Sequence, residues 1–245
     1  MPDLYKLRQI ILNPKAVGAL LTWPKFSVTS YFMVSALRKQ GIEPGSVIDV
    51  GANVGQFAVA SAKLWPGAQV YSFEALPHAL ALLRKHTVRL PNVTVYPLAV
   101  GDEERQQVPF HVNVHSHSSS FLSLADQHLK SFPYAVEEKT IRIDMTTLDS
   151  KLGDQPLEKP TLLKIDVQGY EAKVLKGAIK LLKQIDYLLM EVSFKPMYHG
   201  EVCFPELLEL LEKFSFRFLR PVDWLQDPRT GEVLQMDALF WNERK

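Results

Sequence analysis

The stretch SVIDVGANVGQFAVASAKLW, residues 46–65, places an apolar run before a glycine-containing turn and a helical pattern directly after it. Residues 47–50 have the length and composition of a buried strand, and residues 54–64 repeat apolar side chains at helical spacing. Gly51 and Gly55 bracket the turn, and glycine permits close approach of the backbone to another group. The stretch predicts a strand–turn–helix unit that can hold a ligand at the start of its helix.

Strand and helix patterns alternate along the rest of the chain. Strands separated by helices favour an α/β fold, a parallel sheet covered on both faces. Near the C-terminus two strand patterns follow each other without a helix between them, which predicts an antiparallel edge. The expected strands lie at 69–74, 93–98, 161–166, 186–192, 214–219 and 237–242, and the expected helices at 78–90, 170–183 and 205–213.

Two helices are expected ahead of the first strand, at 4–12 and 28–37. We therefore divide the chain into an N-terminal helical extension, residues 1–45, and one α/β domain, residues 46–245. The extension is expected either to cover the ligand cleft or to form a contact in a homodimer.

An inserted pair of strands is expected after the third strand, at 107–121 and 139–149. In the first of them apolar and polar side chains alternate, so that they occupy opposite faces. The polar face is either exposed to solvent or lines a substrate cleft, with His115 and Ser119 as the candidate substrate contacts. Three histidines on this face allow a metal site as a further alternative. The apolar face comprises Val108, Phe110, Val112 and Val114, and the polar face His111, Asn113, His115 and His117.

Composition and charge limit the class of protein. Hydrophobic residues make up 47% of the 245 residues, which is typical of a globular protein with a large core. The 28 Lys and Arg residues balance 27 Asp and Glu residues, a balance that does not favour nucleic acid or an anionic membrane as partner. The single cysteine, Cys203, favours a reducing compartment. With no signal-peptide pattern and no apolar run long enough to span a bilayer, we expect a cytoplasmic protein.

The residues of the glycine turn do not match two common classes of ligand-binding loop. A phosphate loop would end in Lys-Ser or Lys-Thr, and a dinucleotide fingerprint would place glycine where Asn53 and Gln56 stand. Two acids are present instead: Asp49 before the turn and Glu74 at the end of the next strand. A carboxylate at the second position can accept hydrogen bonds from a ribose diol. A ligand with a ribose, a positive centre and no phosphate is S-adenosylmethionine.

Six segments in residues 46–193 resemble the FkbM-type family of S-adenosylmethionine-dependent methyltransferases: VIDVGANVGQF, VYSFEALPHALALLRKH, VTVYPLAVGDEE, TTLDS, LLKIDVQGYEAKVLKGAIKLL and LLMEVS. KIDVQGYEAKVLKGA is the most specific part, because the glycine turn alone would fit any class I methyltransferase. The resemblance implies a Rossmann-like, doubly wound, mostly parallel sheet. It also implies O-methylation of a hydroxyl group on a sugar or secondary metabolite.

The resemblance also implies which residues contact the cofactor. Asp166 falls near the methionine part of the cofactor, and Glu74 falls on the acid that binds the ribose. The turn residues that correspond to the cofactor loop are Asp49, Gly51, Asn53, Gly55, Gln56 and Phe57, those beside the ribose acid are Ala75 and Pro77, and those flanking the adenine are Ala99 and Val100.

A hydroxyl nucleophile must lose its proton during methyl transfer, so a carboxylate or imidazole beside it assists the reaction. Asp166 and Glu191 end two strands at the ligand-binding edge, and His199 lies in the loop that follows. These three are the candidate catalytic bases. Asp166 could instead cap the VQGYE turn, or share a divalent ion with Glu191 that acidifies the hydroxyl.

Two other functions are also compatible with the sequence. One is a nicotinamide-dependent enzyme, which the broken dinucleotide fingerprint disfavours. The other is a protein that binds S-adenosylmethionine but has lost catalysis and serves as a scaffold, because the sequence does not identify the acceptor pocket.

Overall fold

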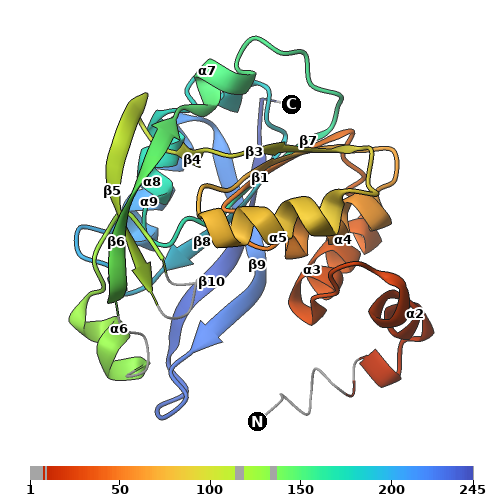
Figure 1. The fold of residues 1–245 in the computed structure, drawn as a ribbon, viewed down its shortest axis with the longest axis horizontal. Helices are drawn as coiled ribbons and strands as arrows, with labels where there is room; N and C mark the ends of the chain where they lie inside the picture. The colour runs from red at the N-terminus through yellow and green to blue at the C-terminus, as the bar shows by residue number, and fades with distance from the viewer. Residues whose placement is uncertain (1–7, 9, 114–118, 133–136, 245) are drawn as a thin grey trace.

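The structure is a computed structural model that describes residues 8, 10–113, 119–132 and 137–244. Its centre is a seven-stranded sheet with the order β3-β2-β1-β7-β8-β10-β9 (Figure 1). Neighbouring strands from β3 to β8 are parallel, and β10 is antiparallel to both β8 and β9. The expected parallel sheet with an antiparallel C-terminal edge is therefore confirmed. The strands are β1 Ser46–Val50, β2 Gln69–Phe73, β3 Val93–Tyr96, β7 Thr161–Ile165, β8 Tyr187–Ser193, β9 Phe216–Gln226 and β10 Val233–Asn242.

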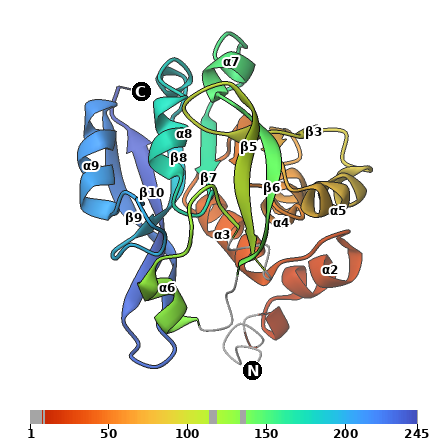
Figure 2. The same cartoon turned by 60° about the vertical axis from the view of Figure 1, so that its left-hand side comes forward.

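Helices cover both faces of this sheet (Figures 1 and 2). Adjacent residues of the central strands point to opposite faces, yet Val47, Ile48, Leu162 and Leu163 are all fully buried. This two-sided burial explains why the strands appear in the sequence as continuous apolar runs. One face carries α3 Val28–Lys39, α4 Gln56–Leu64 and α5 Pro77–Thr87, and the other α7 Leu148–Leu152, α8 Glu171–Lys176, the 3₁₀ helix η2 Leu181–Lys183 and α9 Phe204–Lys213. No helix of the described ranges is long and apolar enough to cross a membrane.

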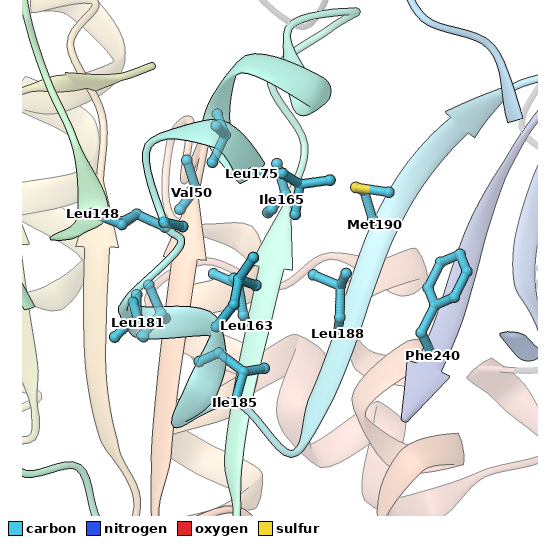
Figure 3. Close-up of a cluster of buried hydrophobic side chains, with 14 of the residues drawn as sticks. Val50, Leu148, Leu163, Ile165, Leu175, Leu181, Ile185, Leu188, Met190 and Phe240 are labelled. Atoms are coloured by element: carbon cyan, nitrogen blue, oxygen red, sulfur yellow. The ribbon is translucent and has the colours of Figure 1, made fainter. Parts of the chain in front are cut away.

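The core on the second face joins the strands to the helices that follow them. Figure 3 shows Leu163, Leu188 and Phe240, from three adjacent strands, in one cluster with Leu175 of α8 and Leu181 of η2. Burying a side chain of this size contributes about 1.5–3 kcal/mol. The cluster therefore fixes β7, β8 and β10 relative to one another, and the cleft described below depends on that arrangement.

The expected helix at 170–183 is interrupted at Gly177. A Cβ atom at this position would lie 2.0 Å from the carbonyl oxygen of Gly101, so only glycine fits. Beyond the break, the Asp149 carboxylate accepts hydrogen bonds from the backbone N–H groups of Lys180 and Leu181. Helical periodicity continues through the segment in sequence, but tertiary contacts divide it into α8 and η2.

The N-terminal extension differs from its expectation. Most of the expected helix at 4–12 lies outside the described residues, and a helix that was not expected, α2, spans Pro14–Thr22. Asn13 caps α2 by accepting hydrogen bonds from the N–H groups of Lys15 and Ala16. An Asn followed by Pro is a helix-start signal, and it could have revealed α2 in the sequence.

The expected inserted strand pair is present as part of a second sheet with the order β4-β6-β5. β4 (Ala99–Val100), β5 (Arg105–Asn113) and β6 (Glu137–Thr146) form this sheet, and α6 (Asp126–Ser131) lies within the insertion. β5 and β6 pair antiparallel, with irregularities that break the simple alternation of faces. Asn113, expected on a polar face, is buried, whereas His115 and His117 lie outside the described residues.

The break at Gly177 yields a stability prediction. Gly177→Ala should lower the free energy of unfolding by about 1–3 kcal/mol, because the added methyl group meets backbone that cannot move away easily. Gly18→Ala is the matched control: Gly18 lies in α2 with open space around its Cβ position, so alanine should stabilise by about 0.5–1 kcal/mol. Urea unfolding of both variants checks this, and equal effects would contradict the steric explanation.

Candidate active site

A cleft of about 380 Å³ opens at the carboxyl ends of the parallel strands. It lies between the turns that follow β1, β2 and β7, the strands β8 and β10, the start of α3, and the second sheet. Ligands of open α/β sheets bind at this edge, and the volume is within the range of about 300–1,000 Å³ that small-molecule sites occupy. The site is therefore built by segments that are distant in sequence and adjacent in the sheet.

The turn after β1 is held tightly against the turn after β7. Gly51 has φ +82°, and a Cβ atom there would lie 1.9 Å from the carbonyl oxygen of Asp166. Gly55 has φ +92° and packs against Leu83 of α5. Both glycines are thus required by the backbone path itself. Gly51, together with Asn53, borders the cleft, so the turn combines a packing role with a place in the ligand site.

Glu74 follows β2 and connects two segments of the cleft wall. Its Oε2 atom accepts a hydrogen bond from the N–H of Asn53 at 2.8 Å, and Oε1 accepts one from the N–H of Leu76 at 2.7 Å. Burial raises the pKa of Glu74, and these two hydrogen bonds oppose the rise. Each carboxylate oxygen has a second lone pair. The carboxylate can therefore hold the turn and still accept hydrogen bonds from a ligand.

The floor of the cleft carries a row of three acids from adjacent strands. Asp166 directly follows β7, Glu191 lies in β8, and Asp237 lies opposite Glu191 in the β8–β10 pairing. All three line the cleft. Because directly opposite residues in neighbouring strands point to the same face, the carboxylates form one acidic surface.

Lys164 lies near the end of β7, two residues before Asp166. It is 6% exposed, its Nζ atom is 3.0 Å from Oδ2 of Asp166, and it lies over the ring of Phe57 at 5.4 Å. Burial alone would lower the pKa of Lys164, but the carboxylates of Asp166, Asp49 and Asp237 outweigh it and raise this pKa. The lysine is therefore a permanent buried cation beneath the acidic floor.

Asp49 lies beside Lys164 in the pairing of β1 with β7 and is fully buried. Within the described part of the chain, neither of its side-chain oxygens has a hydrogen-bond partner. Burial raises the pKa of Asp49 to about 6; Lys164 opposes this rise and Asp166 adds to it. Asp49 lies beneath the cleft instead of lining it, so its contribution to the site is electrostatic.

Gln168 joins the acids of the floor. Its Nε2 atom donates to Oδ1 of Asp166 at 2.9 Å and to Oε2 of Glu191 at 2.8 Å, and its Oε1 accepts from the hydroxyl of Tyr198 at 2.7 Å. The residue has φ 57°, an unfavourable conformation for glutamine that surrounding contacts must maintain. Glu171 supports this turn by accepting a hydrogen bond from the N–H of Val167.

The shared divalent ion has no ready place between Asp166 and Glu191. An amide N–H of Gln168 already bridges these two carboxylates, and Lys164 holds the other oxygen of Asp166. Two donors would have to leave before a cation could bridge the acids. In the ranges that the structure describes, no group of three or more His, Cys, Asp or Glu side chains is arranged to hold a metal ion.

Most of the residues expected in the site border the cleft. Asp49, Gly55 and Pro77 do not line it, and His115 lies outside the described residues. His199 is exposed and does not line it either, so the geometry gives its expected role as a base no support. Those that line the cleft are Gly51, Asn53, Gln56, Phe57, Glu74, Ala75, Ala99, Val100, Ser119, Asp166 and Glu191.

Among the cleft residues that the sequence did not predict, four matter most for its chemistry. Lys164 is a charge inside an apolar strand pattern, and Asp237 likewise interrupts an apolar strand; both were available signals, because a strand buried on two faces rarely carries a charge without a partner. Gln168 gave no signal beyond its place in the VQGYE turn. Phe110 lines the cleft from the apolar side of β5, the side opposite to the one expected.

Comparisons with known proteins show what this chain is similar to. The model of the methyltransferase FkbM domain matches residues 49–218. The 2-O-methyltransferase NoeI of Sinorhizobium fredii is 26% identical over 69% of this chain and 72% of its own length. The hexuronic acid methyltransferase AglP of Haloferax volcanii is 28% identical over 65% of this chain and 61% of its own length. A solved structure, a TehB-like S-adenosylmethionine-dependent methyltransferase from Corynebacterium glutamicum, has 9% identity and a TM-score of 0.47, covering 88% of each chain.

The buried lysine yields a prediction that depends on pH. Lys164→Met should lower the free energy of unfolding by about 3–5 kcal/mol at pH 8, because it leaves buried carboxylates without their cation. The loss should be smaller at pH 5, where Asp49 and Asp237, whose pKa values are already raised to about 6 and about 7, take up protons. Urea unfolding at both pH values measures the difference.

Lys173→Met is the matched control for this substitution. Lys173 forms a half-exposed ion pair with Asp102, and loss of such a pair should cost at most about 1 kcal/mol. An equal loss at pH 5 and pH 8 for Lys164→Met would attribute the effect to packing and contradict the electrostatic account.

Proposed function

This chain belongs to the FkbM methyltransferase family, and from that membership and the cleft we propose that it methylates a hydroxyl group of an uncharged, sugar-like acceptor with S-adenosylmethionine as donor. The single observation that carries the proposal is the charge of the cleft. Its charged lining within the described residues consists of four acids, Glu74, Asp166, Glu191 and Asp237, and one cation, Lys164. Such a lining favours a positively charged, phosphate-free nucleoside over a dinucleotide.

The half of the cleft around Glu74 fits the nucleoside part of the donor. The carboxylate of Glu74 has lone pairs for the two ribose hydroxyls, and charge-assisted hydrogen bonds of this kind are strong. Ala99 and Val100 offer a small apolar surface for the adenine ring, and Gly51 leaves room for the chain of the ligand. The donor, when bound, supplies a methyl group on a positively charged sulfur.

The half of the cleft around the acidic row is suited to a neutral acceptor. Asp166, Glu191 and Asp237 offer hydrogen-bond acceptors to hydroxyl groups, and Phe110 and Phe121 give this side an apolar wall. Sugar rings present both hydroxyl groups and apolar C–H faces. The relative from S. fredii is named a 2-O-methyltransferase, which supports oxygen as the methylated atom.

The protein's contribution to the reaction is mainly positional. Gln168 and Lys164 fix the Asp166 carboxylate from two sides, and Gln168 and Gln235 fix Glu191. Carboxylates held in this way can orient an acceptor hydroxyl toward the donor without moving themselves. Such orientation supplies much of the rate enhancement in reactions between two bound ligands.

The donor assignment predicts the behaviour of Glu74 variants. The protein should bind S-adenosylhomocysteine with a dissociation constant of about 1 μM, equivalent to about 8 kcal/mol. Glu74→Ala should weaken binding by at least about tenfold, because two charge-assisted hydrogen bonds to the ribose are lost. Glu74→Gln keeps one acceptor oxygen and should weaken it less. Titration calorimetry measures all three affinities.

The control must separate ribose binding from support of the glycine turn, because Glu74 also accepts two backbone hydrogen bonds. Glu201 is a matched acid outside the cleft: its Oε2 atom accepts hydrogen bonds from the N–H groups of Met197 and Tyr198. Glu201→Ala should lower the melting temperature as Glu74→Ala does but leave the affinity within about twofold. Unchanged affinity in Glu74→Ala would remove the ribose assignment.

The acceptor assignment predicts a preference between two matched sugars. p-Nitrophenyl glucoside and p-nitrophenyl glucuronide differ only at C6, which is a hydroxymethyl group in the first and a carboxylate in the second. In the cleft this carboxylate would lie near the acidic row of Asp166, Glu191 and Asp237. The glucoside should therefore be methylated with a kcat/KM at least about tenfold higher, because the burial and the neighbouring acids that raise the pKa values of Glu191 and Asp237 also disfavour the negative charge of a bound glucuronide. Although the relative from H. volcanii is named for hexuronic acid, this lining opposes such an acceptor. Preferred methylation of the glucuronide would refute the assignment, and donor binding without turnover on any glycoside would favour the scaffold.

A further inference from the structure

The three acids of the floor differ in how their oxygens are used. Both oxygens of Asp166 accept a hydrogen bond, Oδ2 from Lys164 and Oδ1 from Gln168. Oε2 of Glu191 accepts two, from the side-chain amides of Gln168 and Gln235, at 2.8 and 3.0 Å. Asp166 and Glu191 are thus tied into the framework of the cleft by donors that fix their positions.

Asp237 is not tied in this way. Its side chain lines the cleft, and no hydrogen bond or ion pair from the described residues engages its carboxylate. Its oxygens are not fully buried, and they face the open space of the cleft. Of the three acids, Asp237 is the one with no donor from the described residues on either oxygen, so neither oxygen is committed to holding the side chain in place.

The position of Asp237 follows from the reversal of the last strand. β10 runs antiparallel to β8 and enters the sheet at the carboxyl edge of the parallel strands. This brings a residue from the end of the chain between Glu191 of β8 and Asp223 of β9, the two residues opposite it. Strand pairing on both sides fixes the backbone of Asp237, so its side chain projects from a defined position in the sheet.

The charges around Asp237 come from every strand that packs against it. Burial raises the pKa of Asp237 to about 7; the Lys164 ammonium on β7 opposes this, whereas Asp166 on β7 and Asp223 on β9 add to it. Glu191 on β8 is a further acid across the pair, and its own pKa is raised well above its ordinary value by burial and by the neighbouring acids. A base is most effective when it titrates near the working pH.

We propose that Asp237 is the catalytic base that accepts the proton of the acceptor hydroxyl, an inference that rests on the proposed O-methyl transfer. The acceptor oxygen forms its new bond to the methyl carbon while the electron pair of the carbon–sulfur bond goes to sulfur. The hydroxyl proton passes to the Asp237 carboxylate and leaves to solvent after the product. Asp166 and Glu191 are positioning residues that orient the acceptor through its other hydroxyl groups.

The test compares Asp237→Asn with the unmutated protein on a panel of neutral p-nitrophenyl glycosides. Asparagine keeps the size of the side chain but cannot take the proton, so kcat should fall by about a hundredfold to ten-thousandfold. The kcat/KM of the unmutated protein should rise with pH through about 7, the pKa of Asp237, and the variant should lose this rise. Its affinity for S-adenosylhomocysteine, measured by calorimetry, should stay within about twofold.

The matched control is Asp223→Asn, the neighbouring acid on β9 that does not line the cleft. It should keep its turnover within about twofold and shift the pH rise slightly downward, because it removes a negative charge near Asp237. Asp237→Ser also lacks a carboxyl group and should reproduce the loss seen with Asp237→Asn. Loss of turnover in only one of these two variants would overturn the assignment.

Stability gives a readout that needs no turnover. The pKa of Asp237 is about 7 in the folded protein against an ordinary value of 3.8, so the folded state holds this proton more tightly than the unfolded chain. The unmutated protein must therefore lose stability relative to Asp237→Asn as the pH rises from about 4 to about 7. The melting temperature of the unmutated protein minus that of Asp237→Asn should fall over this range, and a constant difference would overturn the assignment.

The outcomes separate this inference from the proposed function. Methyl transfer by the unmutated protein, with full turnover and an unchanged pH rise in Asp237→Asn, would overturn the role of Asp237 and leave O-methylation standing. Absence of transfer to every glycoside, despite binding of S-adenosylhomocysteine, would overturn both.

Discussion

The ion pairing of a single buried ammonium group makes the acidic site possible. Lys164 lies within the sheet, in contact with Asp166 and between Asp49 and the row of carboxylates at the cleft floor. Without a cation, several acids confined to one region of low dielectric would take up protons or destabilise the fold. The lysine therefore has two effects: it offsets the cost of burying the acids, and it opposes the rise that burial causes in the pKa values of Asp49, Glu191 and Asp237.

The order of the elements could be predicted from the sequence because it depends on local patterns. Strands buried on both faces appear as continuous apolar runs, and the glycine turn is identified by its own residues, Gly51 and Gly55. Glu74 could be placed at the cleft because it directly follows a strand whose end is marked in the sequence. Two features were not predicted. The break at Gly177 depends on a tertiary clash, which local patterns do not contain. The helix α2 begins at a capping signal, Asn13 before Pro14, which the sequence does contain.

The acidic floor could not be predicted because it arises from strand register. Asp166, Glu191 and Asp237 are unrelated in sequence, and their alignment depends on the pairing of three strands, one of them reversed. A shift of one residue would turn any of them to the opposite face. In β5, the regularly paired stretch that contains Phe110 turns its apolar side to the cleft, and the irregularity after Val112 precedes the buried Asn113. The hydrogen bonds of Gln168 to Asp166 and Glu191 depend on a positive φ at Gln168, and the sequence does not predict that conformation for a glutamine.

The contact between Gly51 and the carbonyl oxygen of Asp166 has a consequence for how the two ligands bind. This contact leaves no space for even one methyl group, so the turns after β1 and β7, which border the proposed donor and acceptor parts of the cleft, cannot rearrange independently. A donor that fixes the conformation of the turn after β1 would therefore also fix the turn after β7, where we propose that the acceptor binds. Occupancy of one half is therefore expected to change affinity at the other. Thermodynamic reciprocity makes that coupling equal in both directions: a bound donor changes the affinity for the acceptor by the same factor as a bound acceptor changes the affinity for the donor.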